Sequence, residues 1–156
     1  MSNGVEIWLA LLRIATGVSL LGPGLHKVGW FSRPALEPIL ANWAQHAPNG
    51  LVTSYLHFVT PHHATFARVV ALGELGLGAL LIVGLFTPLA ALLAVFMVAN
   101  FHFASGAMFD TTYLTGGNGL VYLLIYPVLI AGRAGVTFGL DGALGRSISR
   151  SSGARI

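Results

Sequence analysis

The chain has 156 residues, of which 55% are hydrophobic and only 8% are charged, and its mean hydropathy is +0.79. An ordinary soluble domain carries roughly 25% charged residues, so this composition excludes a soluble globule and predicts an integral membrane protein. There is no cysteine, which excludes disulfides and thiolate metal sites, and the net charge of +3 forms no basic stripe that would indicate a nucleic-acid partner.

Four apolar stretches are long enough, or nearly long enough, to cross a bilayer as helices, which takes about 20 residues. In chain order they cover residues 5–28, 61–86, 88–109 and 118–131. We therefore predict an all-α fold, an integral membrane four-helix bundle within residues 1–146, followed by a flexible basic tail at 147–156. The first stretch lacks the pattern of a cleaved signal peptide, so we expect it to be a retained helix.

Two of these helices have a start that the sequence explains. Thr60-Pro61 and Thr87-Pro88 each place a hydroxyl residue before a proline, which predicts a threonine N-cap with proline in the first turn. The second pair leaves a very short connection, so the second and third helices are expected to be antiparallel neighbours.

The connection between the first two apolar stretches carries one amphipathic segment. Its apolar residues recur at helical spacing: Leu36, Ile39, Leu40 and Trp43. This pattern predicts an additional interfacial helix lying on the bilayer. Residues 51–59 are apolar but too short to span, and could pack over the mouth of the bundle.

Basic residues near the predicted helix ends indicate an orientation. The C-terminal part holds four arginines against the single acid Asp141, namely Arg133, Arg146, Arg150 and Arg155. Because cytoplasmic segments are enriched in Lys and Arg, this bias favours both termini in the cytoplasm.

Ionisable side chains within the apolar stretches are the first candidates for a site. Arg13 and Glu74 fall at comparable depths when counted from the predicted helix ends, and Asn100 falls near them. A charge facing lipid costs about 2.5–3.5 kcal/mol on insertion scales, so we expect Arg13 and Glu74 to pair inside the bundle. Such a pair would either form a quinone, proton or ion site or only set the register of the helices. Arg68 is expected to extend to the interface instead.

The six histidines are the second set of candidates: His26, His46, His57, His62, His63 and His102. Imidazole can bind a metal or hydrogen bond to a quinone carbonyl. None of the spacings matches a known metal motif, so no metal site is predicted. His102 is the only one placed deep in a span.

Glycines recur in the first two helices, at positions 17, 22, 24, 73, 76, 78 and 84. In membrane helices small residues favour close helix packing. A glycine-rich helix end could also frame a ligand pocket, and both interpretations stay open.

Several of these segments resemble the DoxX/DoxD-like membrane proteins. The similar segments are Arg13 to Gly17, Gly22 to Lys27, Gly73 to Gly78, Gly84 to Ala90, and Gly132 to Leu144. The resemblance implies a four-helix bundle in a prokaryotic cytoplasmic membrane. In the DoxD branch it further implies a subunit of thiosulfate:quinone oxidoreductase.

Three functions remain open from the sequence. The first is a membrane subunit of a quinone-reducing oxidoreductase, with a quinone as its cofactor near Glu74. The candidate quinone or polar site then consists of Arg13, Glu74, Asn100, His102, His26 and Lys27. The second is a small non-catalytic subunit of a larger respiratory or photosynthetic complex, whose partners are lipid and other subunits. The third is a transporter or channel, although no repeat symmetry supports it.

Overall fold

The computed structural model describes residues 3–113, 115 and 119–145, and these residues form helices and turns without a β-strand. The predicted all-α fold is thereby confirmed. The predicted tail at 147–156, and residue 118 at the expected start of the fourth apolar helix, lie outside the described residues.

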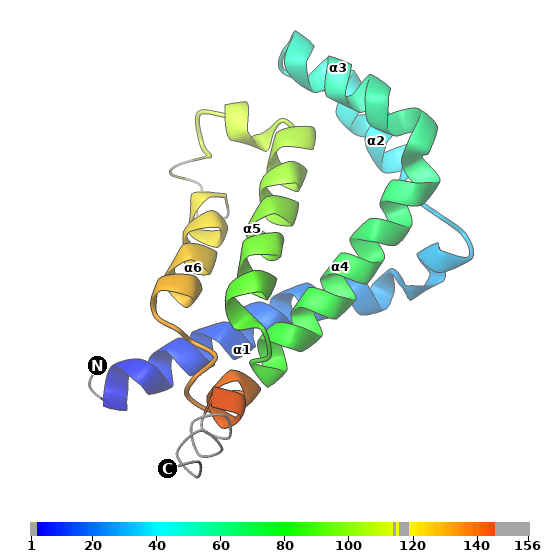
Figure 1. The fold of residues 1–156 in the computed structure, drawn as a ribbon. Coiled ribbons are helices and arrows are strands. Elements are labelled where there is room, and N and C mark those ends of the chain that lie inside the picture. The colour runs from blue at the N-terminus through cyan, green and yellow to red at the C-terminus, as the bar shows by residue number, and fades with distance from the viewer. Residues whose placement is uncertain (1–2, 114, 116–118, 146–156) are drawn as a thin grey trace, which may run out of the picture.

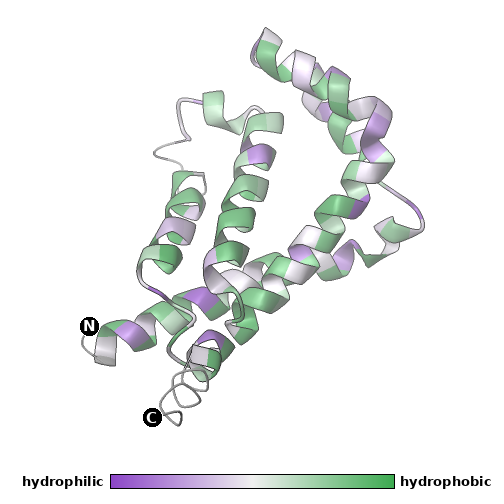
Figure 2. Cartoon of the chain, viewed as in Figure 1, coloured by the Kyte–Doolittle hydropathy of each residue, from purple (hydrophilic) through white to green (hydrophobic). Residues whose placement is uncertain are grey.

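The four predicted apolar helices are all present. Their bounds are α1 (Asn3–His26), α4 (His63–Val83), α5 (Thr87–Ala104) and α6 (Leu120–Ala131). Three helical segments are long and apolar enough to cross a membrane: Gly4–His26, Gly50–Val83 and Thr87–Ala104. α6 is equally apolar but only 12 residues long. Apolar residues dominate all four helices, as Figure 2 shows, which fits their contact with lipid.

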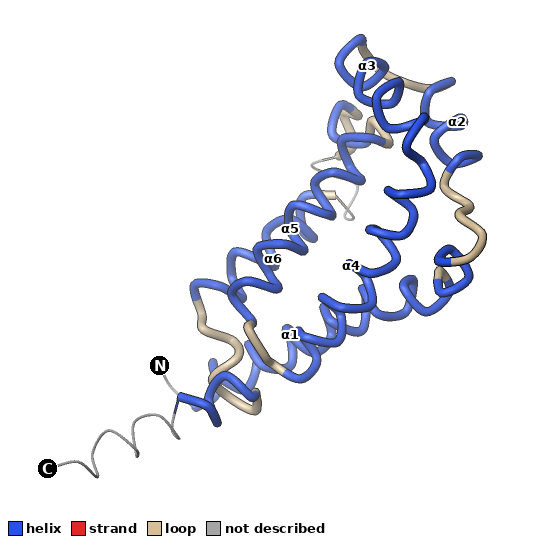
Figure 3. Tube along the Cα trace, turned by 45° about the vertical axis from the view of Figure 1, so that its right-hand side comes forward, coloured by secondary structure: helices blue, strands red, loops and turns tan. Residues whose placement is uncertain are grey.

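α1 packs antiparallel along the C-terminal half of α4, while α5 and α6 lie side by side (Figures 1 and 3). Glycines allow the first contact. A Cβ on Gly17 would lie 2.8 Å from the carbonyl oxygen of Gly78, and one on Gly24 would lie 2.9 Å from the Leu75 nitrogen. The close helix packing expected from the glycines is therefore present at these positions.

The first connection folds into a small helical unit with its own apolar core. α2 (Glu37–Gln45) and α3 (Gly50–Val59) pack together, and α3 continues into α4 through the 3₁₀ helix η2 (Thr60–His62). The predicted apolar stripe on α2 is packed into this core, with Leu36 and Leu40 buried. The stripe thus meets α3 and neighbouring protein, where the sequence predicted a face turned to the bilayer. Two further 3₁₀ turns are η1 (Val28–Phe31) and η3 (Ala107–Phe109).

The predicted threonine N-caps are wrong. The hydroxyl of Thr60 donates to the Leu56 carbonyl instead of capping α4, and the hydroxyl of Thr87 is buried without a partner. Pro88 lies in the first turn of α5 as expected, whereas Pro61 lies in η2, ahead of the first turn of α4. The start of α5 is capped by a side chain distant in sequence, the carboxylate of Asp141.

The segment that follows α6, residues 132–145, folds back over the turn between α4 and α5 (Figure 1). The Asp141 carboxylate accepts hydrogen bonds from the backbone nitrogens of Phe86, at 2.7 Å, and Thr87, at 2.9 Å. The Asp141 nitrogen in turn donates to the Gly84 carbonyl at 2.9 Å. This segment therefore ties the end of the chain to the α4–α5 turn.

Candidate functional site

A buried ion pair lies between the end of α1 and the middle of α4. The ammonium of Lys27 donates to Glu74 Oε1 at 2.5 Å, and the Glu74 side chain is only 6% exposed. The other carboxylate oxygen, Oε2, is buried and has no hydrogen-bond partner. The oxygen has already lost its contact with water, and this desolvation costs free energy. A hydrogen bond from a ligand would therefore add little further desolvation cost.

Two aromatic rings flank the ammonium of Lys27. Its Nζ lies 5.5 Å from the centre of the Trp30 ring and 5.9 Å from that of Phe101. A cation within about 6 Å of a ring face is attracted by the ring quadrupole. Lys27 is 23% exposed whereas Glu74 is nearly enclosed, so a ligand would reach the pair from the side of Lys27.

The local sequence explains why Lys27 reaches Glu74. α1 ends at His26, and a tight turn follows, in which the Lys27 nitrogen donates to the Gly24 carbonyl at 3.0 Å. Because Gly24 has no side chain, this end of α1 can pack directly against α4. A Cβ on Gly24 would lie only 3.0 Å from the Glu74 Cβ. The glycine brings the end of one helix against the midpoint of another, and the ion pair closes the contact.

The expected Arg13–Glu74 pair is wrong. Arg13 is fully buried beside the α4–α5 turn, where its Nη2 donates to the Phe138 carbonyl at 2.9 Å and the Asp141 charge lies nearby. Its neighbour is Gly84, the residue after the end of α4, which lies about 15 Å along the helix axis from Glu74. The prediction assumed that α1 and α4 end at the same depth in the membrane. They do not, because the first turns of α1 extend beyond the end of α4.

The remaining predicted site residues are dispersed. Asn100 donates to the Tyr55 hydroxyl at 2.5 Å, and His102 Nδ1 is hydrogen-bonded to the Tyr113 hydroxyl at 2.8 Å. His26 is exposed at the end of α1. Of the six candidates, the structure therefore brings together only Lys27 and Glu74. No group of three or more metal-ligating side chains occurs among the described residues.

The family model named DoxX matches residues 8–107, which is more than half of the chain. The match includes most of α1 and all of α4 and α5, together with both members of the ion pair. The chain belongs to the DoxX family. No curated protein and no solved structure matches it. The sequence resemblance to DoxX is thus confirmed at the level of the family, and with it a membrane protein with apolar helices suited to the bilayer.

Sequence reasoning missed two groups of this candidate site. Trp30 is not among the predicted site residues, although its position three residues after Lys27 suits contact within a turn. Phe101 gave no signal, because an aromatic residue in an apolar helix is ordinary. The surroundings of the pair are therefore visible only in the fold.

Proposed function

We propose that this DoxX-family chain is a membrane subunit that binds a quinone at the Lys27–Glu74 pair, in the cytoplasmic membrane of a prokaryote. The observation that carries the proposal is a buried, hydrogen-bonded ion pair at the middle of an apolar helix, with one carboxylate oxygen unsatisfied. Charged groups at such depth are rare and mark ligand or proton pathways more often than lipid-facing surface.

The chemistry of the pair suits both forms of a quinone. The ammonium of Lys27 has further N–H groups for a quinone carbonyl, while Glu74 Oε2 can accept from a quinol hydroxyl. The rings of Trp30 and Phe101 give a quinone ring apolar surface to pack against. As in the DoxD branch, the electrons would come from a soluble sulfur-oxidising partner such as a thiosulfate-oxidising subunit.

A built-in reporter allows a direct binding test. Trp30 lies beside Lys27, so a bound quinone ring should quench its fluorescence once Trp8 and Trp43 are replaced by phenylalanine. Titration with ubiquinone-1 or menadione should give saturable quenching. Glu74→Gln should weaken it roughly tenfold, the effect of about one charge-assisted hydrogen bond. Glu37→Gln, in the exposed part of α2, is the matched control and should leave the titration unchanged.

A second test of quinone binding measures enzymatic activity in membranes. Glu74→Gln should abolish thiosulfate-dependent quinone reduction while the protein remains inserted at its normal level. Quenching that does not saturate, or full activity with Glu74→Gln, would refute quinone binding at this pair.

One observation favours a different function, a packing subunit in a larger respiratory or photosynthetic complex. An apolar groove of about 400 Å³ runs between α4 and α5. Glycines at positions 73 and 76 line it and place no side chain in the groove. Such a surface can receive a helix of another subunit. Affinity purification from native membranes distinguishes the two functions. Recovery with a soluble sulfur-oxidising protein supports the redox subunit, and recovery within a large membrane complex supports the packing subunit.

A further inference from the structure

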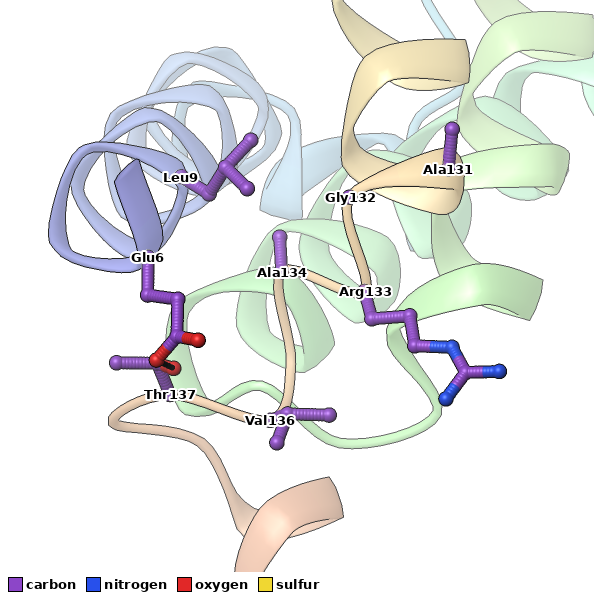
Figure 4. Close-up of a pocket in the computed structure, with 8 residues that line it drawn as sticks. All are labelled: Glu6, Leu9, Ala131, Gly132, Arg133, Ala134, Val136 and Thr137. Atoms are coloured by element: carbon purple, nitrogen blue, oxygen red, sulfur yellow. Dashed lines mark hydrogen bonds between the residues drawn. The ribbon is translucent and has the colours of Figure 1, made fainter. Parts of the chain in front are cut away.

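A second pocket lies at the opposite end of α1, far from the ion pair, and has a volume of about 340 Å³. It is formed by the first turns of α1 and the chain that leaves α6, with Leu9, Gly132 and Val136 in its wall (Figure 4). α1 enters its membrane-spanning segment at Gly4 and α6 ends at Ala131. The pocket therefore lies where two apolar helices meet the headgroup layer of a bilayer.

The pocket presents one acid and one base that do not pair with each other. Glu6 Oε2 accepts from the hydroxyl of Thr137 at 3.2 Å, and this is the only side-chain partner of Glu6 among the described residues. Figure 4 shows the guanidinium of Arg133 directed away from Glu6, with the backbone at Ala134 and Val136 between them, so the two charges are separated. Within the described part of the chain, the Arg133 guanidinium has no hydrogen bond or ion pair.

The backbone at Arg133 gives a reason to regard this side chain as functional. Arg133 has φ of 49°, in the left-handed region that residues with a Cβ rarely adopt. Glycine would satisfy this turn without strain, and the neighbouring positions 132 and 135 are in fact glycines. Such strain is found at functional positions, but Phe86 and Phe138 share this conformation, so it supports a role for Arg133 only together with the guanidinium that the described residues leave unpaired.

We propose that this pocket binds the headgroup of a zwitterionic phospholipid of the phosphatidylethanolamine type. The phosphate pairs with Arg133, the ammonium donates to Glu6, and the apolar wall receives the first carbons of the lipid. Separate charges of opposite sign match a headgroup whose own charges are separated, whereas a purely anionic lipid leaves Glu6 without a cation. The proposal is independent of quinone binding, because the two sites lie at different ends of α1.

The test compares three lipids on the purified, delipidated protein. Dioleoyl phosphatidylethanolamine, phosphatidylcholine and phosphatidylglycerol are added separately, and bound lipid is counted by native mass spectrometry while thermal unfolding is followed in parallel. The ethanolamine lipid should bind most tightly, because choline cannot donate N–H hydrogen bonds and glycerol lacks the cation. Equal binding of all three lipids to the wild-type protein overturns the proposal.

Two variants separate binding from folding. Arg133→Gly removes the guanidinium and also the strained backbone, so the lipid-free protein should be at least as stable as wild type while ethanolamine-lipid binding weakens roughly tenfold. Glu6→Gln keeps an acceptor for Thr137 but loses the attraction for an ammonium, so the preference over phosphatidylglycerol should disappear. Unchanged lipid binding in Arg133→Gly refutes the site.

A matched control and a soluble ligand complete the design. Phe86 also has a left-handed backbone, with φ of 49°, but does not line the pocket. Phe86→Gly should relieve strain in the same way and leave lipid binding unchanged; a loss equal to that of Arg133→Gly would show that strain relief alone explains the effect. Free phosphoethanolamine carries the same two charges, and if it binds as tightly as the lipid, the membrane is not the source of the ligand.

Discussion

Gly17 and Gly78 meet backbone to backbone where α1 crosses α4: a Cβ on Gly78 would lie 2.9 Å from the Gly17 carbonyl oxygen and 2.8 Å from the Leu21 nitrogen. Backbone atoms cannot move aside as a flexible side chain can. The separation of the two helices is therefore set at this contact, and with it the alignment that brings Lys27 against Glu74.

Gly78→Ala should destabilise the protein, because the added methyl group forces α1 and α4 apart. Overpacking of this kind costs about 1–3 kcal/mol. Gly76→Ala is the control, since a Cβ at that position meets nothing within 4 Å. It should be neutral or stabilise by up to about 1 kcal/mol through helix propensity. The free energy of unfolding can be measured by SDS titration in mixed micelles, and equal effects of the two substitutions would contradict the close contact.

Asp141→Ala should destabilise the turn between α4 and α5, because two backbone N–H groups at the start of α5 lose their acceptor. Loss of such a cap costs about 1–2 kcal/mol. Asp141→Asn retains an oxygen acceptor for only one of the two N–H groups and loses the charge near Arg13, so it should recover only part of the stability. Asp110→Ala is a useful comparison: Asp110 accepts from the Thr112 nitrogen at 2.7 Å but is fully exposed. A larger loss there than at Asp141 would argue against the capping role.

Lys27→Met should be more harmful than the double replacement Lys27→Met/Glu74→Leu. The single change leaves a buried carboxylate without a counter-charge, which costs about 3–5 kcal/mol at fully buried pairs. Because Lys27 is 23% exposed, we expect a smaller loss, of about 2 kcal/mol. The double variant removes both charges and should recover most of it. Strictly additive losses in this cycle would mean that the two side chains do not interact.

Alkaline pH should weaken the contact between α5 and the loop that follows it. Burial raises the pKa of Tyr113, whose hydroxyl is hydrogen-bonded to His102. A raised pKa in the folded state means that the stabilisation is complete below the ordinary tyrosine pKa of about 10 and is lost as pH rises through the folded value. Tyr113→Phe should remove this part of the pH dependence, which thermal unfolding between neutral and alkaline pH can detect. A profile identical to wild type would contradict the assignment.

The helices were predictable because each carries its own evidence. An apolar run long enough to span a bilayer identifies a helix without reference to the rest of the chain, so α1, α4, α5 and α6 were all found to within a few residues at their described ends. The third helix was expected to reach residue 109 but ends at Ala104, since Gly106 takes a left-handed conformation with φ of 78°. Gly17 and Gly78 signalled close packing for a similar reason, because small residues in membrane helices favour close helix approach.

The site was predicted only in part, because it depends on how two helices slide along each other. The sequence predicts that Glu74 is paired, and it is, but the predicted partner is Arg13 at a comparable counted depth, whereas the observed partner is Lys27. The sequence contains no measure of that relative displacement. Likewise, nothing in the neighbourhood of Thr87 indicates that Asp141 supplies its cap, since hydroxyl capping by Thr87 itself satisfied every local rule.

The molecule has two apolar cores, one among the long helices and one formed by α2, α3, the start of α4 and the end of α5. α4, which joins them, has 21 residues, or about 32 Å, which is close to the hydrocarbon thickness of about 30 Å. Each core can therefore unfold locally while the other stays packed. We expect the α2–α3 unit to open locally, so that its amide protons exchange with deuterated solvent within minutes. The amide protons of α4 near Leu81 should remain protected over the same time.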